Sequence, residues 1–126
     1  TGTRNNAFGY LALNANETGV RNNAFGSEAL RLNTADDNTA FGDAALEVNT
    51  AGTRNSAFGA NALAANVGAS DDNSAFGYIA LQSNTSGTNN TAVGSRVLSA
   101  TTEGSFNVGV GVNALLFNTT GINNVA

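Results

Sequence analysis

Apolar and small residues recur along the chain in one fixed pattern. A Phe or Val that is followed by Gly returns at Phe8, Phe25, Phe41, Phe58, Phe76, Val93 and Val110. The steps between these positions are 17, 16, 17, 18, 17 and 17 residues. A period this regular is typical of repeat architectures, in which each repeat is one unit stacked on the next. The chain therefore predicts a stacked repeat and not an ordinary globule.

Within each repeat, larger apolar residues alternate with small ones. Fragments such as 27–32 have helical propensity, but Asn, Thr or Gly ends each of them within a few residues, which is too short for a stable helix. A period of two fits better, because alternate residues of a strand face opposite sides. We expect two short strands in each turn, joined by Gly, Asn and Thr corners. Stacked turns then form an all-β parallel β-solenoid of about seven turns, with about 17 residues in each.

The alternation assigns residues to two faces of this solenoid. The Phe and Val positions above are expected to face the core, together with a Leu that follows each of them by five residues: Leu13, Leu30, Leu46, Leu63, Leu81, Leu98 and Leu115. The Ala residues that precede the Phe or Val are expected to form a smooth outer face: Ala7, Ala24, Ala40, Ala57, Ala75 and Ala92. A core of one Phe and one Leu in each turn is thin, so a second buried surface is needed. We therefore expect the small-residue face to mediate symmetric self-association.

Asn occupies two further positions in almost every repeat. One set lies three residues before the Phe or Val: Asn5, Asn22, Asn38, Asn55, Asn73, Asn90 and Asn107. The other lies eight residues after it: Asn16, Asn33, Asn49, Asn66, Asn84 and Asn118, with Thr101 in the remaining repeat. Stacked Asn amides can donate to one another from turn to turn. The two sets therefore predict Asn ladders at buried corners.

Composition narrows the chemistry. The chain has no His or Cys, which removes the usual ligands of zinc, and for catalysis it offers no His, Cys or Lys. Its carboxylates are scattered over different turns, and its Gly residues lack the Lys-Ser/Thr of a phosphate-binding loop. The net charge of -4 gives no basic patch for nucleic acid, and no apolar run is long enough to insert into a membrane. We expect a non-catalytic protein without a cofactor.

Charged residues occur mainly at predicted corners. Four residues before the Phe, the column of equivalent positions alternates in sign through Arg21, Asp37, Arg54 and Asp72, which would fix the register of stacked turns. Two acidic clusters, at 36–38 and 71–73, could contribute some of the oxygen ligands that calcium needs. Solvated corners paired with Arg are the favoured interpretation of both clusters.

Two other patterns have a functional and a structural interpretation. Four sequons for N-glycosylation begin at Asn16, Asn84, Asn89 and Asn118. Such matches are expected in an Asn- and Thr-rich repeat, and most of these Asn residues belong to the predicted ladders. A Thr column at positions 34, 50, 85, 102 and 119 raises an ice-binding alternative, although Glu17 and Val67 interrupt it.

The repeat also resembles a known group of proteins. The motif Asn-[Asn/Thr/Ser]-Ala-[Phe/Val]-Gly, followed by Ala-Leu and Asn-Thr, resembles the head repeats of trimeric autotransporter adhesins. It is equally similar to the Asn-Thr-Ala-x-Gly-x-x-Ala-Leu repeats of phage tail fibres and of bacterial surface proteins with an endosialidase-type chaperone domain. The resemblance covers essentially the whole chain. Its departures are a longer turn than the adhesin heads have, and Phe where those heads carry Ile or Val.

This resemblance implies a left-handed β-roll with three identical chains around one axis. It also implies an extracellular location, either on a bacterial surface through an outer-membrane anchor or on a virion tail fibre. Residues 1–126 are then a single repeat domain within a longer fibre protein. We expect a structural and adhesive homotrimer that attaches to a host-cell, matrix or glycan receptor. The alternative is an ice-binding β-solenoid that uses a Thr/Asn array.

Overall fold

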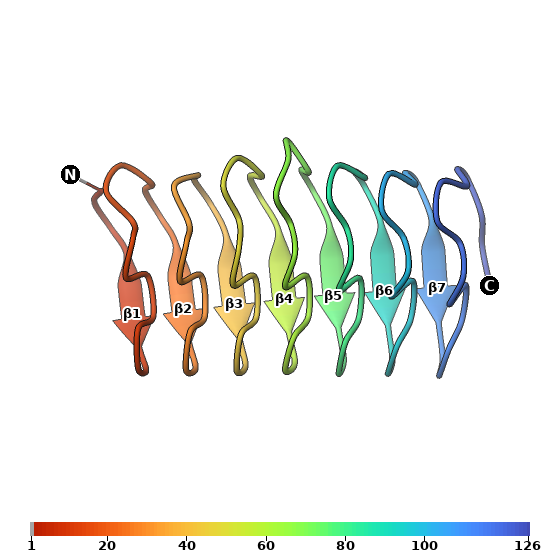
Figure 1. Ribbon diagram of the computed structural model, residues 1–126, viewed down its shortest axis with the longest axis horizontal. Helices are drawn as coiled ribbons and strands as arrows, with labels where there is room; N and C mark the ends of the chain where they lie inside the picture. Colours follow the sequence, from red (N-terminus) through yellow and green to blue (C-terminus); the bar gives the residue numbers. More distant parts are fainter. Residues whose placement is uncertain (1) are drawn as a thin grey trace.

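The structure is a computed structural model that describes residues 2–126, and within them the chain forms a parallel β-solenoid without helix. The seven strands are β1 (Asn6–Phe8), β2 (Asn23–Phe25), β3 (Thr39–Phe41), β4 (Ser56–Phe58), β5 (Ser74–Phe76), β6 (Thr91–Val93) and β7 (Val108–Val110). They form one parallel sheet in sequence order (Figure 1). Equivalent residues pair in register, as Ala24 with Ala40 and Phe25 with Phe41. The predicted all-β solenoid of about 17 residues per turn is confirmed.

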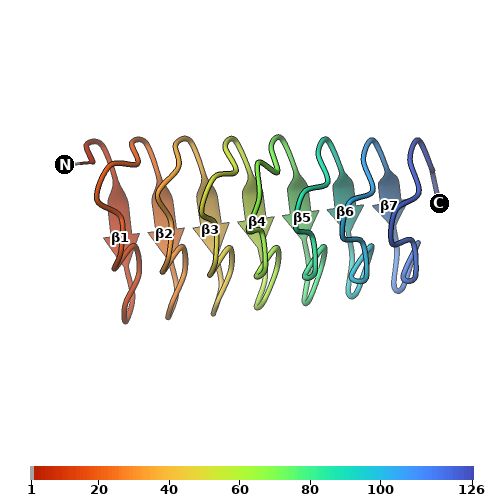
Figure 2. The same cartoon turned by 45° about the horizontal axis from the view of Figure 1, so that its top comes forward.

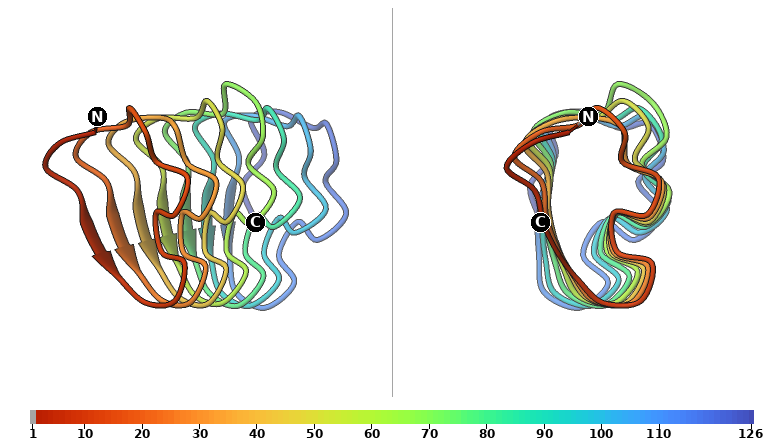
Figure 3. Two further views of the ribbon diagram at one scale, coloured as in Figure 1. Left: turned by 60° about the vertical axis from the view of Figure 1, so that its left-hand side comes forward. Right: turned by 90° about the vertical axis from the view of Figure 1, so that its left-hand side faces the viewer.

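Each turn contains one strand and not the two that the alternation predicts. After Phe25 the chain makes consecutive tight turns, in which the Ala29 N–H donates to the Gly26 carbonyl at 3.4 Å and the Arg31 N–H to the Glu28 carbonyl at 3.2 Å. Glu28 and Leu30 have left-handed backbones, with φ of 57° and 51°. Left-handed residues at alternate positions prevent an extended strand, although the turns still bond to one another across the stack. Seen end-on, the strands make a nearly straight side and the tight turns a wavy side opposite it (Figure 3).

The core contains only Ala and Leu, with one Val. The fully buried apolar residues are Ala24, Ala29, Leu30, Ala40, Ala45, Leu46, Ala57, Ala62, Leu63, Ala75, Ala80, Leu81, Ala92, Val97 and Leu98. Leu13 and Leu115, in the end turns, are partly buried against them. The Leu residues therefore lie in the core as predicted.

The seven Phe and Val positions lie outside this core, so their assignment to it was wrong. Phe25, Phe41, Phe58, Phe76 and Val93 expose 36–41% of their surface, and Phe8 and Val110 expose 76% and 59%. The strand turns the Ala before each of them inward, and a period of two then turns the Phe outward.

Limited width explains why the strand places Ala and not Phe inside. In β7, Gly109 replaces the inward Ala, and the facing residue is Val97 where other turns have Ala. A Cβ added to Gly109 would lie 2.5 Å from the Cγ1 of Val97, so the two positions share one small space. The sheet and the wavy side are therefore too close for an aromatic ring.

Both Asn columns form buried ladders. In the first, the side-chain oxygen of each Asn accepts the backbone N–H of the next, as Asn38 Oδ1 does from Asn55 at 3.0 Å. Its Nδ2 donates to a carbonyl of the next turn, as Asn38 does to Gly52 at 2.9 Å. In the second column the amides bond directly: Asn49 donates to Asn33 and Asn66 to Asn49, each at 2.7 Å. The predicted ladders are confirmed. Only the end members Asn5, Asn16 and Asn118 are partly exposed.

The turns vary in length at one corner only. The longest step, 18 residues from Phe58 to Phe76, produces a loop that projects beyond its neighbours between β4 and β5 (Figure 1, and end-on in Figure 3). With the stack tilted forward, the turns on either side of this corner still follow one another in one row (Figure 2). Asn55 and Asn73, on either side of this step, still bond at 3.0 Å. The extra residue therefore changes the corner and leaves the ladder in register.

Candidate functional surface

No pocket is present in the described part of the chain. Residues 2–126 also contain no group of three or more His, Cys, Asp or Glu that could hold a metal ion. Within the same residues there is no helix that is both long and apolar enough to cross a bilayer. A candidate functional site must therefore be an open surface.

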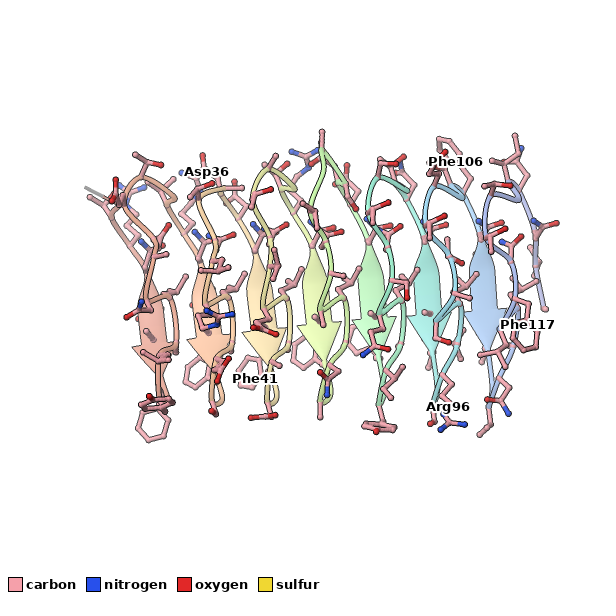
Figure 4. All side chains as sticks on the ribbon, viewed as in Figure 1. Asp36, Phe41, Arg96, Phe106 and Phe117 are labelled. Atoms are coloured by element: carbon pink, nitrogen blue, oxygen red, sulfur yellow. The ribbon has the colours of Figure 1, made fainter. Side chains whose placement is uncertain are left out.

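One apolar surface stands out, and we call it the aromatic ridge: Phe25, Phe41, Phe58 and Phe76. Successive ring centroids lie 4.5, 5.1 and 5.0 Å apart, with interplanar angles of 10°, 5° and 9°. Phe8 extends it less regularly, at 6.5 Å and 29° from Phe25. The ridge follows from in-register parallel pairing, which places identical side chains above one another. Phe41 marks it at the lower end of the strands in Figure 4.

The geometry of the ridge limits what it can bind. Stacked rings cover one another's faces and present their edges outward, so the apolar face of a sugar cannot pack on a ring face within the stack. A column of half-exposed small polar residues runs beside the ridge on the same side of the sheet: Asn23, Thr39, Ser56, Ser74 and Thr91. Beyond Phe76 the ridge narrows to Val93 and Val110. Its chemistry is that of a long apolar edge suited to packing against another apolar surface.

The Ala face predicted for self-association does not exist as a surface. Ala24, Ala40, Ala57, Ala75 and Ala92 are fully buried within their own chain, and only Ala7, in the first turn, is exposed. The sequence does contain a signal for which side chains of the strand point inward. The residue two before each Phe is polar in six of the seven turns, and a period of two puts it on the same side as Phe. If the Phe pointed inward, the Asn, Thr or Ser two residues before it would also lie in the core.

The predicted charge column forms ion pairs at the upper corner. Arg21 bonds Asp37 at 2.5 and 2.7 Å, and Arg54 bonds Asp72 at 2.7 and 2.9 Å. These bonds lower the pKa of both carboxyls and raise the pKa of both guanidinium groups. Arg31 makes similar contacts, at 3.1 Å to Glu28 and with Glu47. The Arg21 and Arg54 pairs are exposed, so they fix the register of the turns more than they stabilise them.

The acidic clusters supply hydrogen bonds to the corners. Asp36 Oδ1 accepts the Val20 N–H at 2.9 Å, and Asp71 Oδ1 accepts the Thr53 N–H at 2.7 Å. Ser105 does the same for Thr88 at 3.0 Å in a later turn. Since a hydroxyl can replace the carboxylate in this role, the arrangement favours a structural corner over a calcium site.

Most residues of the Thr column also make hydrogen bonds within the protein, from their hydroxyls to carbonyls of the next turn. Thr34 Oγ1 donates to the Thr50 carbonyl at 2.5 Å, and Thr85 donates to Thr102 at 3.0 Å. The exposed Val67 interrupts the column. Hydroxyls whose protons are used within the protein offer solvent only lone pairs, which weakens the case for an ice-binding array.

No protein-family model, curated protein sequence or solved structure matches the chain.

Proposed function

We propose that this domain is a structural and adhesive segment of a fibre. Three copies lie side by side, with their aromatic ridges turned toward a common axis. The observation that carries the proposal is the ridge itself, because it is straight, apolar and parallel to the long axis of the solenoid. A partner that runs along that axis can cover every ring at once.

The exposed area is large enough for association. A Phe side chain has about 200 Å² of surface. With 36–41% exposed, each of the four rings presents about 75 Å², or about 300 Å² for one chain. That value is near the largest apolar patch of a typical monomer, and such patches are often functional. Three chains together would bury about 900 Å² of ring surface, or about 300 Å² in each pairwise contact. Residues beside the ridge would have to supply most of the roughly 1,200 Å² that a specific interface buries.

The number of chains and the direction of winding follow the resemblance to trimeric adhesins and tail fibres. Left-handed winding is part of the proposal, and the path of the chain in the end-on view of Figure 3 supports it. In such a trimer the charged corners, at the opposite end of the strands from the ridge, point away from the axis. Those corners are then the surface that meets a host-cell, matrix or glycan receptor outside a bacterium or at a virion tail.

A pair of variants tests the association. Phe41→Asp combined with Phe58→Asp places charges at the centre of the ridge without touching the Ala and Leu core. Val67→Asp is the matched control, because Val67 is an exposed apolar residue, at 46%, that lies outside the ridge. We expect light scattering after gel filtration to give the mass of three chains for the parent and the control, and of one folded chain for the double variant. A monomeric parent, or a double variant that keeps the trimer mass, would overturn the proposal.

A further inference from the structure

Only one of the four sequons has a free acceptor. The amides of Asn16, Asn84 and Asn118 donate to carbonyls of their own turns at 3.0, 2.9 and 3.4 Å. Asn89 is exposed, and its side chain makes no hydrogen bond within residues 2–126. A sugar attached to Asn84 would have to replace a fully buried group, whereas one attached to Asn89 would meet solvent.

The backbone presents both residues of the Asn89 sequon to the outside. Asn89 lies at the upper corner with φ of 57°, and Thr91 begins β6 on the outer side of the sheet. Asn90 between them points inward and belongs to the buried ladder, where its Nδ2 donates to Gly104 at 2.8 Å. Thr91 is half exposed, and its hydroxyl makes no hydrogen bond within the described residues. The carboxamide and the hydroxyl that define a sequon are therefore both accessible.

An otherwise unexplained aromatic residue lies beside Asn89. Phe106 occupies the same position in the next turn, where its N–H donates to the Thr88 carbonyl at 3.0 Å. It exposes 56% of its surface and has φ of 59°, a backbone conformation that is costly for a bulky side chain. The first five turns carry Arg or Asp at this position. In Figure 4 Phe106 lies at the top of the stack, far from the ridge that Phe41 marks, so the ring has no role in the proposed trimer contact.

We propose that Asn89 is a site of N-glycosylation and that the first sugar packs against Phe106. In the transfer, the Asn89 amide nitrogen attacks the anomeric carbon of a sugar activated as a diphosphate ester. The new carbon–nitrogen bond forms as the bond from that carbon to the diphosphate oxygen breaks. The amide proton passes to a base of the transferring enzyme, and no redox change occurs. The exposed ring of Phe106 would cover the apolar face of the sugar, as aromatic rings commonly do for apolar partners.

The site is tested on the folded protein. A purified N-glycosyltransferase that transfers glucose from UDP-glucose to sequons is added, and the modified peptides are mapped by mass spectrometry. A peptide containing a sequon, in the same reaction, shows that the enzyme is active. We expect hexose on Asn89, none on Asn16, Asn84 or Asn118, and none anywhere in Asn89→Gln. Absence of hexose from Asn89, or equal modification of Asn84, would overturn the site.

A second measurement tests the role of Phe106. Phe106→Asn restores a residue type that occurs at this position elsewhere, as at Asn123. Glycosylation should raise the melting temperature of the parent and leave that of Phe106→Asn unchanged. An equal rise in both proteins would show that the sugar does not pack on the ring.

Discussion

Completion of the second Asn ladder should stabilise the protein. Thr101 occupies a position at which the other turns have Asn, and the Oδ1 of Asn84 below it is buried without a hydrogen-bond partner. The Thr101 hydroxyl donates instead to the Asn118 carbonyl at 2.6 Å. In Thr101→Asn, the new Nδ2 can donate to Asn84, as Asn66 donates to Asn49 at 2.7 Å. Gly104 follows at the same spacing as the Gly that accepts from Asn49 and Asn84 in their own turns.

The magnitude follows from two opposing terms. An unpaired buried acceptor costs about 1–3 kcal/mol, and the hydrogen bond lost at Asn118 is worth about 1 kcal/mol. The net gain is about 1 kcal/mol, which would raise the melting temperature of a chain of this size by about 4 °C. The reverse change in another turn, Asn66→Thr, leaves the Asn49 oxygen unpaired and should destabilise by about 2 kcal/mol.

Equilibrium unfolding in urea measures both changes. Thr102→Asn is the matched control, because its hydroxyl lies at a partly exposed corner where no buried acceptor needs a partner. We expect the control to alter the free energy of unfolding by less than about 0.5 kcal/mol. If Thr101→Asn were neutral or destabilising while the control behaved as expected, the idea that the unpaired Asn84 oxygen limits stability would be refuted.

Two further predictions concern the backbone and the ion pairs. Asn61 has φ of 57°, so Asn61→Ile should destabilise the protein by about 1 kcal/mol in the same urea assay, whereas Asn61→Gly should be nearly neutral. Equal effects of the two substitutions would mean that a left-handed backbone at this position costs no free energy. Hydrogen bonds to Arg21 and Arg54 lower the pKa values of Asp37 and Asp72. The ion pairs therefore contribute fully to the free energy of unfolding above the ordinary Asp pKa of about 3.9. This contribution should be lost as pH falls through the lowered pKa values. The urea midpoint should therefore decline less with acid in an Arg21→Gln, Arg54→Gln variant than in the parent. Identical declines in the two proteins would contradict the prediction.

The period and the Asn columns were predictable because they depend on equivalence between repeats. Any residue that returns every 17 or so positions must stack on its counterpart, whichever way it faces, so the ladders and the paired charges followed directly. The direction of the Phe side chains did not follow, because a period of two defines two faces without saying which is inside. The size of the space beneath the sheet decides that. Two features of the sequence indicate the answer: the polar residue two positions before the Phe in most turns, which shares its face, and the exchange between Gly109 and Val97.

The prediction of a second strand in each turn was wrong for a different reason. Leu30 and its equivalents are apolar and alternate with other residues, which is the usual pattern of a half-buried strand. Their φ values near 50° break that strand into turns. Leu has no intrinsic preference for this conformation, so neither propensity nor pattern could reveal it. In-register stacking imposes the same costly backbone on every turn, as part of one cooperative arrangement.

The projecting corner between β4 and β5 shows that the solenoid tolerates a longer loop at that point without a shift in its ladders. A solenoid built this way can display foreign sequence. Short peptides inserted near 67–70, or at the same corner of other turns, would stand one above another at the spacing of the strands, about 4.8 Å. In a trimer they would point away from the common axis. The scaffold could therefore present a dense, regular array of ligands whose spacing is set by the backbone and whose identity is free to change.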